Sequence, residues 1–347
     1  MSERNGLISI VGATGVVGQE LISILTGRGV SPDRLRLFAS TRSAGTRVDV
    51  CGTPVEIRET EAGAVGEAGL VYLAASSGVA REIGPVLGER GCFVVDNSSA
   101  FRMDPATALV VPEVNAEAVE PVRRAGRGLI ANPNCSTIIM LVAVDPLRRR
   151  WGCERIVAST YQAVSGAGAA AMAELESQTR DVLAGKDPVP EALHEPCAFN
   201  VFSHDSSVDP HTGRNVEEQK MIDETRKIWN DPRVMVDATC VRVPVLRAHS
   251  ESIRVTLEEP ASLDEVRAEL GSRAWLRVVD DRAGNRFPTP RAASGGDVTL
   301  VGRIRPDASR DAEADGRSRH WHLFVSGDQI RKGAALNAVQ IGELLTG

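Results

Sequence analysis

Several features that would tie a protein to a membrane or to nucleic acid are missing from this chain of 347 residues. No apolar run is long enough to cross a bilayer, and the segment 1–5 leads straight into a predicted strand rather than a signal peptide. The formal net charge of −6 argues against non-specific nucleic-acid binding. We therefore expect a cytoplasmic protein with no membrane and no nucleic-acid partner.

Cysteine is sparse and widely scattered. The six cysteines show no CxxC spacing and no close cluster with histidine, so neither a zinc site nor a redox motif is indicated. We expect no bound metal, and thiols kept reduced. The six are Cys51, Cys92, Cys135, Cys153, Cys197 and Cys240.

The first third of the chain alternates short apolar strands with helical stretches. This alternation predicts a doubly wound parallel sheet of the Rossmann type, and a chain of this length fits two domains. The predicted helices are Gly15–Gly27 and Val79–Arg90. The predicted strands are Leu7–Gly12, Leu35–Ala39, Leu70–Ala74, Cys92–Asp96, Leu109–Val111 and Gly128–Ala131.

Beyond Cys135 the strands become longer and alternate between apolar and polar residues. That pattern predicts a second, α+β domain with a mixed or antiparallel sheet. An exposed loop is expected over Arg305–Arg319, and an amphipathic helix over Lys332–Leu345 is expected to pack back on the first domain. The strands are predicted at Glu154–Tyr161, Val234–Val243, Ser252–Leu257, Val298–Arg305 and His320–Val325, and the helices at Ala169–Leu183, Val216–Trp229 and Leu263–Gly271.

A glycine turn follows the first predicted strand. Glycines at positions 12, 15 and 18 permit a tight turn, close approach to a pyrophosphate and close helix–strand packing. The spacing GxxGxxG, with a strand before it and a helix after it, predicts a dinucleotide site. Nucleotide-sugar epimerases and short-chain reductases share this spacing, but they need a YxxxK pair that neither Tyr72 nor Tyr161 provides. The candidate contacts are Gly12, Thr14, Gly15, Val16 and Val17.

The second strand bears on which nucleotide is bound. An NAD site usually has Asp or Glu at the end of this strand, to bind the ribose 2′-hydroxyl. Here the strand runs into Ser40, Arg42 and Ser43, which suits a 2′-phosphate. The sequence therefore favours NADP, the alternative being that Arg42 is a solvated surface charge.

Asn132-Pro133-Asn134-Cys135-Ser136-Thr137 lies between a predicted strand and an apolar helical run, Ile138–Val144. Ser136 or Thr137 is able to cap that helix. Cys135 then lies at the helix amino terminus, where backbone N–H groups and the helix dipole favour the nucleophilic thiolate. The alternative is a buried structural cysteine.

A thiolate that attacks a carbonyl also needs a group that transfers protons, and histidine suits neutral pH. Of the six histidines, His249 follows a predicted strand that also delivers Arg242, which gives it a modest advantage. The remaining histidines are expected in loops or on strand surfaces.

Taken together, the motifs resemble those of the aspartate-semialdehyde dehydrogenase family, in the same order and over essentially the whole chain. They are the glycine turn 12–18, the cysteine segment 132–137, Gln162–Gly168, Arg242–His249, Val301–Arg305 and Arg331–Asn337. Two segments depart from the usual pattern: residues 74–78 leave cofactor contacts open, and residues 202–208 are given no role beyond a loop over the site or at a subunit contact.

The resemblance implies a role for each matching residue. Cys135 would be the nucleophile, His249 the general acid/base and Gln162 the residue that orients the acyl group. Arg242 would bind the substrate carboxylate, and Glu217, otherwise a surface ion pair with Lys220, the substrate ammonium. Phosphate would contact Arg102, Lys220 and Asn134, and the cofactor would contact Ser165, Gly166 and Asn337.

The implied reaction is NADPH-dependent conversion of L-4-aspartyl phosphate to L-aspartate 4-semialdehyde and phosphate, a step toward lysine, threonine and methionine. Residues 1–134 with 331–347 would bind NADP, and residues 135–330 would form a catalytic and dimerisation domain. A homodimer or homotetramer is expected. The alternatives are an N-acetyl-γ-glutamyl-phosphate reductase, whose acylated substrate amine gives no reason for an acid such as Glu217, and a non-catalytic NADP-binding paralogue.

Overall fold

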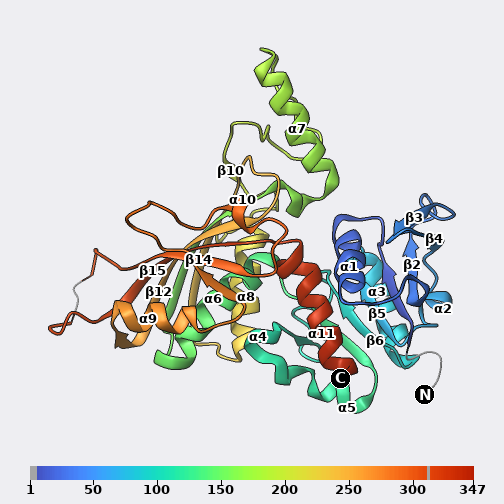
Figure 1. The fold of residues 1–347 in the computed structure, drawn as a ribbon, viewed down its shortest axis with the longest axis horizontal. Coiled ribbons are helices and arrows are strands. Elements are labelled where there is room, and N and C mark those ends of the chain that lie inside the picture. Colours follow the sequence, from blue (N-terminus) through green and yellow to red (C-terminus); the bar gives the residue numbers. More distant parts are fainter. Residues whose placement is uncertain (1–5, 311–312) are drawn as a thin grey trace. The chain divides into compact units, whose positions relative to one another are not determined.

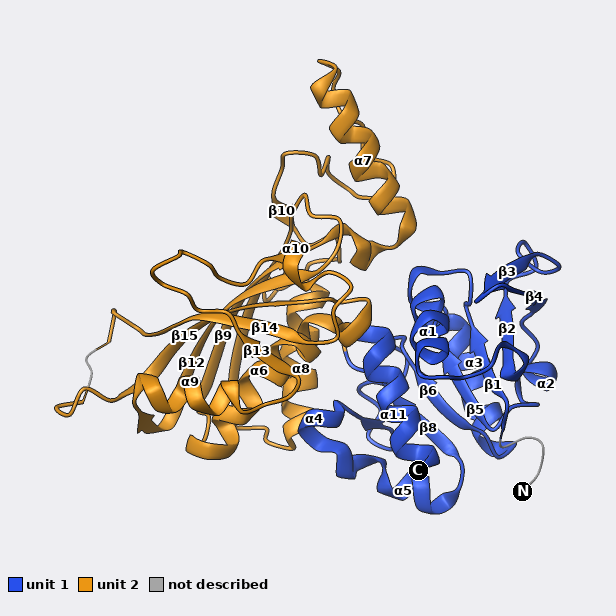
Figure 2. Cartoon of the chain, viewed as in Figure 1, with its two compact units in different colours: residues 1–133, 334–347 blue, residues 134–333 orange. Residues whose placement is uncertain are grey.

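A computed structural model describes residues 6–310 and 313–347. The chain divides into two compact units, shown in Figure 2. Unit 1 consists of the chain up to Pro133 together with Ala334–Gly347, and unit 2 is Asn134–Gly333. The predicted fold class, a Rossmann-type domain joined to an α+β domain, is confirmed.

Unit 1 contains one sheet whose strands, among the described residues, run in the order β3-β4-β2-β1-β5-β6-β8-β7. All pairs are parallel except β3 with β4. The strands are β1 (Ile8–Val11), β2 (Leu35–Ala39), β3 (Arg47–Val50), β4 (Thr53–Glu59), β5 (Leu70–Leu73), β6 (Phe93–Asp96), β7 (Ala108–Leu109) and β8 (Gly128–Ala131).

Helices cover both faces of this sheet. One core cluster joins the sheet to α1 and α11, and a second joins it to α3, as Figure 1 shows for unit 1. Parallel strands buried on both faces read as continuous apolar runs, which made them predictable. The helices are α1 (Val16–Gly27), α2 (Ala62–Val65), α3 (Ser77–Glu89), α4 (Pro112–Asn115), α5 (Glu120–Ala125) and α11 (Leu336–Thr346).

Two parts of unit 1 differ from the sequence prediction. The strand predicted at Leu109–Val111 ends at Leu109, because Pro112 fixes the first turn of α4 and Val111 becomes its N-cap. The β3–β4 hairpin was not predicted. Its turn residues Cys51 and Gly52 both have positive φ, 53° and 82°, and a cysteine is an unusual residue at such a position.

Unit 2 contains a mixed sheet in the order β10-β11-β9-β12-β15-β14-β13, counted over the described residues. The β9–β11 and β13–β14 pairs are parallel, and the others are antiparallel. The strands are β9 (Arg155–Gln162), β10 (Phe202–Ser203), β11 (Met235–Arg242), β12 (His249–Ala261), β13 (Leu276–Val278), β14 (Thr299–Pro306) and β15 (Ser318–Gly327).

Three helices of unit 2 pack on one face of its sheet: α6 against β12, α8 against β11 and α9 against β14. In Figure 2, α7 extends away from this sheet. Alternate residues of β9 are buried, which produces the polar–apolar pattern of the sequence. The helices are α6 (Cys135–Trp151), α7 (Ala169–Leu183), α8 (Val216–Trp229), α9 (Leu263–Gly271) and α10 (Pro290–Ala293).

Three further expectations concern the chain ends and one loop. The residues that connect β14 with β15 fall within the predicted loop 305–319, of which 311 and 312 lie outside the described residues, as does the segment 1–5. The carboxy-terminal helix was predicted as one piece, but Arg331–Ala335 is a π-helical turn and α11 begins at Leu336. In the described part of the chain, no helix has the length and apolarity to span a membrane.

Candidate active site

Cys135 is the first residue of α6, and the residue before it caps the helix. The side-chain oxygen of Asn134 accepts hydrogen bonds from the backbone N–H groups of Ser136 (3.0 Å) and Thr137 (3.2 Å). The prediction that Ser136 or Thr137 is the cap was wrong, because both already lie in the first helical turn. The predicted position of Cys135 at the helix amino terminus is nevertheless what the structure has.

Exposure distinguishes Cys135 from most of the other cysteines. Cys92, Cys153, Cys197 and Cys240 are buried, and burial raises the pKa of Cys153 to about 12 and that of Cys197 to about 11. Cys135 is partly exposed, and only Cys51, in the β3–β4 turn, is more so. Buried thiols of this kind remain protonated and inert at neutral pH.

Gly333 lies directly against Cys135. A Cβ atom built on Gly333 would be 2.9 Å from the Cys135 Cβ and 3.3 Å from its Cα. Real Cβ contacts are essentially never that short, so any side chain at this position would displace the cysteine or the π-helical turn. Glycine at 333 therefore keeps the space beside the thiol open.

A buried hydrogen-bond network extends from Asn134 through unit 2. The Glu217 carboxylate accepts from Asn134 Nδ2 (2.7 Å), from Gln162 Nε2 (3.0 Å) and from Lys220 Nζ (3.1 Å). Gln162 Nε2 also donates to the Ser136 hydroxyl at 2.7 Å. Gln162 Oε1 is buried and has no hydrogen-bond partner among the described residues, so one acceptor remains for a ligand.

Glu217 is not the surface ion pair that its spacing from Lys220 first suggests, because it is only 4% exposed. Burial alone raises the pKa of its carboxyl group. The charges of Lys220 and His204 and the hydrogen bonds from Asn134 and Gln162 outweigh burial and bring the pKa to about 2. Glu217 is therefore a buried, ionised carboxylate at neutral pH.

His249, the first residue of β12, is fully buried. Its Nδ1 accepts a hydrogen bond from the backbone N–H of Ala163 at 3.0 Å. A backbone N–H only donates, so the neutral ring carries its proton on Nε2. That Nε2 has no hydrogen-bond partner among the described residues. Burial, reinforced by the nearby Arg242 charge, lowers the His249 pKa to about 3, so the ring is neutral at pH 7.

Arg242, the last residue of β11, is 1% exposed and its guanidinium is held on several sides. Nη1 donates to the Ala163 carbonyl at 2.9 Å, while Nε (3.1 Å) and Nη2 both contact the Asp205 carboxylate. Nη2 is also 3.0 Å from His204 Nε2. The backbone of Ala163 thus holds His249 by its N–H and Arg242 by its C=O.

His204 and Asp205 belong to the segment 202–208, which the sequence predicted only as a loop over the site or at a subunit contact. Burial is the main cause that lowers the His204 pKa. The pKa of Asp205 is lowered as well, because the Arg242 charge and hydrogen bonds outweigh its burial. Nothing in the local sequence signals these contacts. They arise because β10, the first two residues of this segment, pairs with the end of β11.

Ser165 and Gly166 lie beside these groups. A Cβ on Gly166 would be 3.3 Å from His249 Cε1 and 3.4 Å from Arg242 Nη1, so this backbone passes close to both side chains. The Ser165 hydroxyl accepts a hydrogen bond from Gln329 Nε2. Their predicted contact with the nicotinamide stays a prediction.

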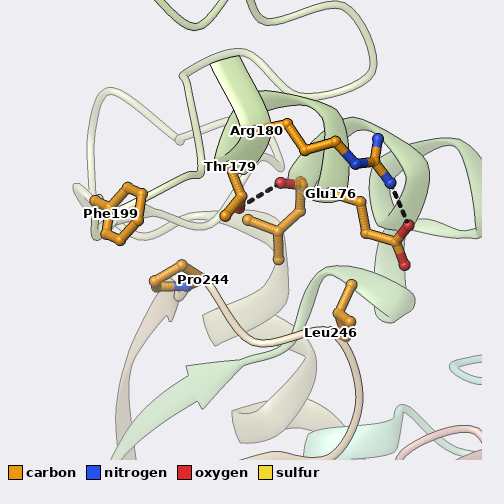
Figure 3. A pocket seen from close by; sticks show the side chains of 7 residues that line it. Glu176, Thr179, Arg180, Phe199, Pro244 and Leu246 are labelled. Atoms are coloured by element: carbon orange, nitrogen blue, oxygen red, sulfur yellow. Dashed lines mark hydrogen bonds and ion pairs between the residues drawn. The ribbon is translucent and has the colours of Figure 1, made fainter. Parts of the chain in front are cut away.

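A hollow of about 480 Å³ lies next to the loop that connects Arg242 with His249. Figure 3 shows Pro244 and Leu246 of this loop facing α7 and Phe199 across it. None of the predicted site residues is among its lining residues, which are Leu175, Glu176, Thr179, Arg180, Phe199, Pro244 and Leu246.

Unit 1 contains the predicted nucleotide turn between β1 and α1. A Cβ on Gly12 would be 2.3 Å from the Ala74 carbonyl oxygen, and one on Gly18 would be 2.2 Å from the Gly12 carbonyl oxygen. These two glycines are required by packing. Gly15, the N-cap of α1, has one neighbour at 3.3 Å, and the helix has no side-chain cap. Val16 and Val17 begin this helix, and the backbone N–H groups of a helix amino terminus are suited to bind an anion. Their predicted contact with the cofactor stays a prediction. Thr14 is exposed on the same turn.

After β2, Ser40 and Arg42 are exposed and Ser43 is half-buried. An acidic residue does lie nearby, although β2 itself provides none. Glu59, at the end of the neighbouring strand β4, accepts a hydrogen bond from the Thr41 hydroxyl at 2.7 Å. Sequence analysis missed it because β4 was not predicted.

Arg102 and Asn337 also belong to unit 1. Arg102 is largely buried and donates to the Asn97 carbonyl at 2.9 Å. The Asn337 amide is fully buried and donates to the Val110 carbonyl (3.0 Å) and to Asn132 Oδ1 (2.7 Å). Asn337 thus fastens α11 to the end of β8, while its role toward a cofactor stays a prediction.

Two family models match the chain, one in each unit. Residues 7–122 match the model described as semialdehyde dehydrogenase, NAD binding domain. Residues 144–332 match the model described as semialdehyde dehydrogenase, dimerisation domain. The first match supports a nicotinamide cofactor, and the second supports association between copies of the chain.

The chain is similar over nearly its full length to proteins named aspartate-semialdehyde dehydrogenase. It is 44% identical to the one from Synechocystis sp., covering 97% of this chain and 96% of the relative. It is 39% identical to the one from Bacillus subtilis, covering 97% and 96%. A crystal structure from Vibrio cholerae, titled aspartate semialdehyde dehydrogenase II complexed with ASA, superposes with a TM-score of 0.90 at 38% identity, covering 99% and 98%.

Proposed function

The chain belongs to the aspartate-semialdehyde dehydrogenase family, and on that premise we propose that it converts L-4-aspartyl phosphate to L-aspartate 4-semialdehyde and phosphate, reversibly. The observation that carries the proposal is the partly exposed Cys135 at the start of α6, in the same unit as the Gln162–Glu217 network and the buried His249. The reaction would serve lysine, threonine and methionine biosynthesis in the cytoplasm.

In the first step the Cys135 thiolate attacks the acyl carbon, the bond from carbon to the phosphate oxygen breaks, and phosphate leaves with the electron pair. The product is a thioester on Cys135. A bound nicotinamide cofactor supplies the hydride that this thioester requires. The helix dipole of α6 and the N–H groups of its first turn favour the anionic sulfur, both before attack and when the aldehyde leaves.

His249 acts in this scheme as a neutral imidazole that holds a proton on Nε2. With Nδ1 occupied by the Ala163 N–H and a pKa of about 3, the ring offers a hydrogen-bond donor to the acyl oxygen, where negative charge develops. The family resemblance implies that His249 is a general acid/base. In this scheme it acts as the proton and hydrogen-bond donor only. Gln162, whose Nε2 donates to the Ser136 hydroxyl next to Cys135, orients the acyl group.

The substrate carries an ammonium group, a carboxylate and a phosphate, and the proposed site provides partners for all three. The buried carboxylate of Glu217 suits the ammonium, and the guanidinium of Arg242 suits the carboxylate. Lys220 and Asn134, with Arg102 of unit 1, are proposed for the phosphate. A buried anion at Glu217 disfavours an acetylated amine, which argues against the N-acetyl-γ-glutamyl-phosphate alternative.

The proposal is tested by phosphate-dependent oxidation of L-aspartate semialdehyde, followed by the rise in reduced nicotinamide absorbance. We expect activity in the wild type, loss of at least about 10³-fold in Cys135→Ala, and no change in Cys51→Ala, which removes the other accessible thiol. Mass spectrometry of the quenched wild type should find an acyl adduct on Cys135. Retention of activity by Cys135→Ala would overturn the mechanism, and a non-catalytic paralogue would be inactive throughout.

For the cofactor, we propose NADP over NAD. The exposed Arg42, with Ser40 and Ser43, supports this because a guanidinium among hydroxyl groups suits a 2′-phosphate. Arg42→Ala should raise KM for NADP roughly tenfold and leave KM for NAD within about twofold. Glu59→Gln, which removes the nearby carboxylate, should lower KM for NADP. Equal effects on both nucleotides would contradict the preference.

A further inference from the structure

Asp328 is a buried carboxylate that the proposed reaction does not use. It directly follows β15 and is 1% exposed. Its Oδ1 accepts hydrogen bonds from the backbone N–H groups of Ile330 and Arg331, both at 3.0 Å. Its Oδ2 accepts from Arg247 Nε and from the Gly295 N–H, both at 2.6 Å. Each oxygen thus accepts two hydrogen bonds, and the carboxylate joins segments that are distant along the chain.

One of these segments borders Cys135. Arg331 begins the π-helical turn, and the Asp328 carbonyl accepts a hydrogen bond from the Gly333 N–H of that turn at 3.1 Å. Gly333 lies so close to Cys135 that no side chain fits between them. The carboxylate and the carbonyl of Asp328 therefore both hold the backbone that passes beside the thiol.

Another of these segments leads to His249. Arg247 is two residues before His249, and Ala248 between them is fully buried with a φ of +76°. A residue other than glycine is strained in this conformation and keeps it only where its surroundings hold it. The Ala248 N–H donates to Gln329 Oε1 at 2.8 Å, and Arg247 is bound to Asp328. The two residues that follow β15 therefore hold the backbone just before His249.

The proposed reaction depends on how these two side chains lie relative to each other. The His249 donor must meet the acyl oxygen while the acyl carbon is bonded to the Cys135 sulfur. A misplacement of about 1 Å between reacting groups can cost roughly 10²-fold in rate. Asp328 is bound to the backbone beside both groups, so it is placed to fix this relation.

We propose that Asp328 is a positioning residue, which holds the backbone beside Cys135 and the backbone before His249 in one arrangement. This inference rests on the proposed function. Asp328 acts through the Gly333 turn on one side and through Arg247 on the other, and not on the reacting atoms themselves.

Asp328→Asn separates the two attachments. The amide oxygen can still accept from Ile330 and Arg331, an arrangement that asparagine adopts readily, whereas the amide nitrogen in place of Oδ2 meets two donors. We expect kcat for oxidation of L-aspartate semialdehyde to fall roughly 10- to 100-fold, with KM within about threefold of the wild type. Alkylation of Cys135 by iodoacetamide without substrates, followed by mass spectrometry of its peptide, should keep its rate within about twofold.

Arg247→Met breaks the same attachment from its partly exposed partner. Alone it should lower kcat by a similar factor. Combined with Asp328→Asn it should cause little further loss, because both changes remove one link, whereas two independent disturbances would multiply. If Asp328→Asn does not fold, the effect of Arg247→Met on kcat decides the question.

Asp280→Asn is the matched control. Asp280 is also buried, and its Oδ2 lies 2.6 Å from Nη1 of Arg267 on α9, at the β13 edge of the sheet. Thermal unfolding should show that both aspartate variants are destabilised. When kcat is measured well below both unfolding temperatures, it should fall in Asp328→Asn and stay within about twofold in Asp280→Asn.

Failure of this inference differs from failure of the proposed function. A wild type without activity on L-aspartate semialdehyde overturns the proposed function, and this inference with it. With an active wild type, four results overturn the role of Asp328 alone: unchanged kcat in Asp328→Asn or in Arg247→Met, a multiplied effect of the two, a parallel loss of Cys135 alkylation in Asp328→Asn, or an equal fall of kcat in Asp280→Asn.

Discussion

Glu251 is a buried carboxyl group outside the proposed reaction. It lies on β12 two residues after His249, is fully buried, and neither of its oxygens has a hydrogen-bond partner among the described residues. Burial, with a smaller contribution from the Glu217 charge, raises its pKa well above the usual 4.5. The folded protein therefore keeps Glu251 protonated at a pH where the unfolded chain has lost the proton.

That difference predicts a pH-dependent stability. Below about pH 4.5 both states are protonated; above it only the unfolded state ionises, so stability falls with rising pH by up to about 1.4 kcal/mol per unit. Glu251→Gln removes this loss. Urea unfolding at pH 5 and pH 8 measures this effect. Relative to the wild type, the free energy of unfolding of Glu251→Gln should be higher at pH 8 than at pH 5, whereas that of the exposed control Glu259→Gln should not change between the two pH values. If the free energy of unfolding had the same pH dependence in Glu251→Gln and in the wild type, Glu251 would be ionised in the folded state.

At this scale the sequence identified residue types better than their contacts. The motifs selected Gln162, Glu217, Arg242 and His249, and the structure places all four in unit 2. The sequence did not indicate that the backbone of Ala163 holds both His249 and Arg242. It also did not indicate that His204 lies next to Arg242. Backbone groups carry no sequence signature, and loop contacts depend on strand pairing between distant segments.

At the level of elements, the start of α6 depends on Asn134. The side-chain oxygen caps the helix, and the amide nitrogen donates to Glu217. One residue thus joins the cysteine's helix to the buried carboxylate on α8. The sequence predicted the helix but the wrong cap, since Asn, Ser and Thr are all good caps and three of them follow one another within four positions.

The two functions of Asn134 can be separated. Asn134→Ala should lower the free energy of unfolding by about 1 kcal/mol more than Asn134→Ser, because serine restores the cap and neither residue donates to Glu217. Chemical denaturation of both variants at pH 7 measures this difference. Equal stabilities would mean that the hydrogen bond to Glu217, rather than the cap, fixes the start of α6.

For the whole molecule, unit 2 exposes apolar side chains around α7 and the segment that follows it. Leu183, Val189, Phe199 and Val201 are 76%, 66%, 67% and 59% exposed. Large apolar side chains left exposed are candidates for an association surface, and the matching family model for this unit is described as a dimerisation domain. We therefore propose a homodimer, with a homotetramer as the alternative, assembled through unit 2.

Phe199→Asp should weaken this association by at least about tenfold, because it places a charge in an apolar contact. Light scattering coupled to size-exclusion chromatography over a dilution series would measure it. Met103→Asp changes a residue of unit 1 that is 51% exposed and should leave the mass unchanged. A Phe199→Asp protein with the wild-type mass at every concentration would place the interface elsewhere.

The return of the chain to unit 1 after Gly333 has a consequence for synthesis on the ribosome. Leu336, Ile341 and Leu345 of α11 belong to the same core as β1 and β5, and Asn337 fastens the end of β8. Translation delivers these residues only after all of unit 2. Unit 1 is therefore the first to start and the last to be complete during synthesis. The apolar residues that α11 covers stay exposed while about 200 residues of unit 2 are translated.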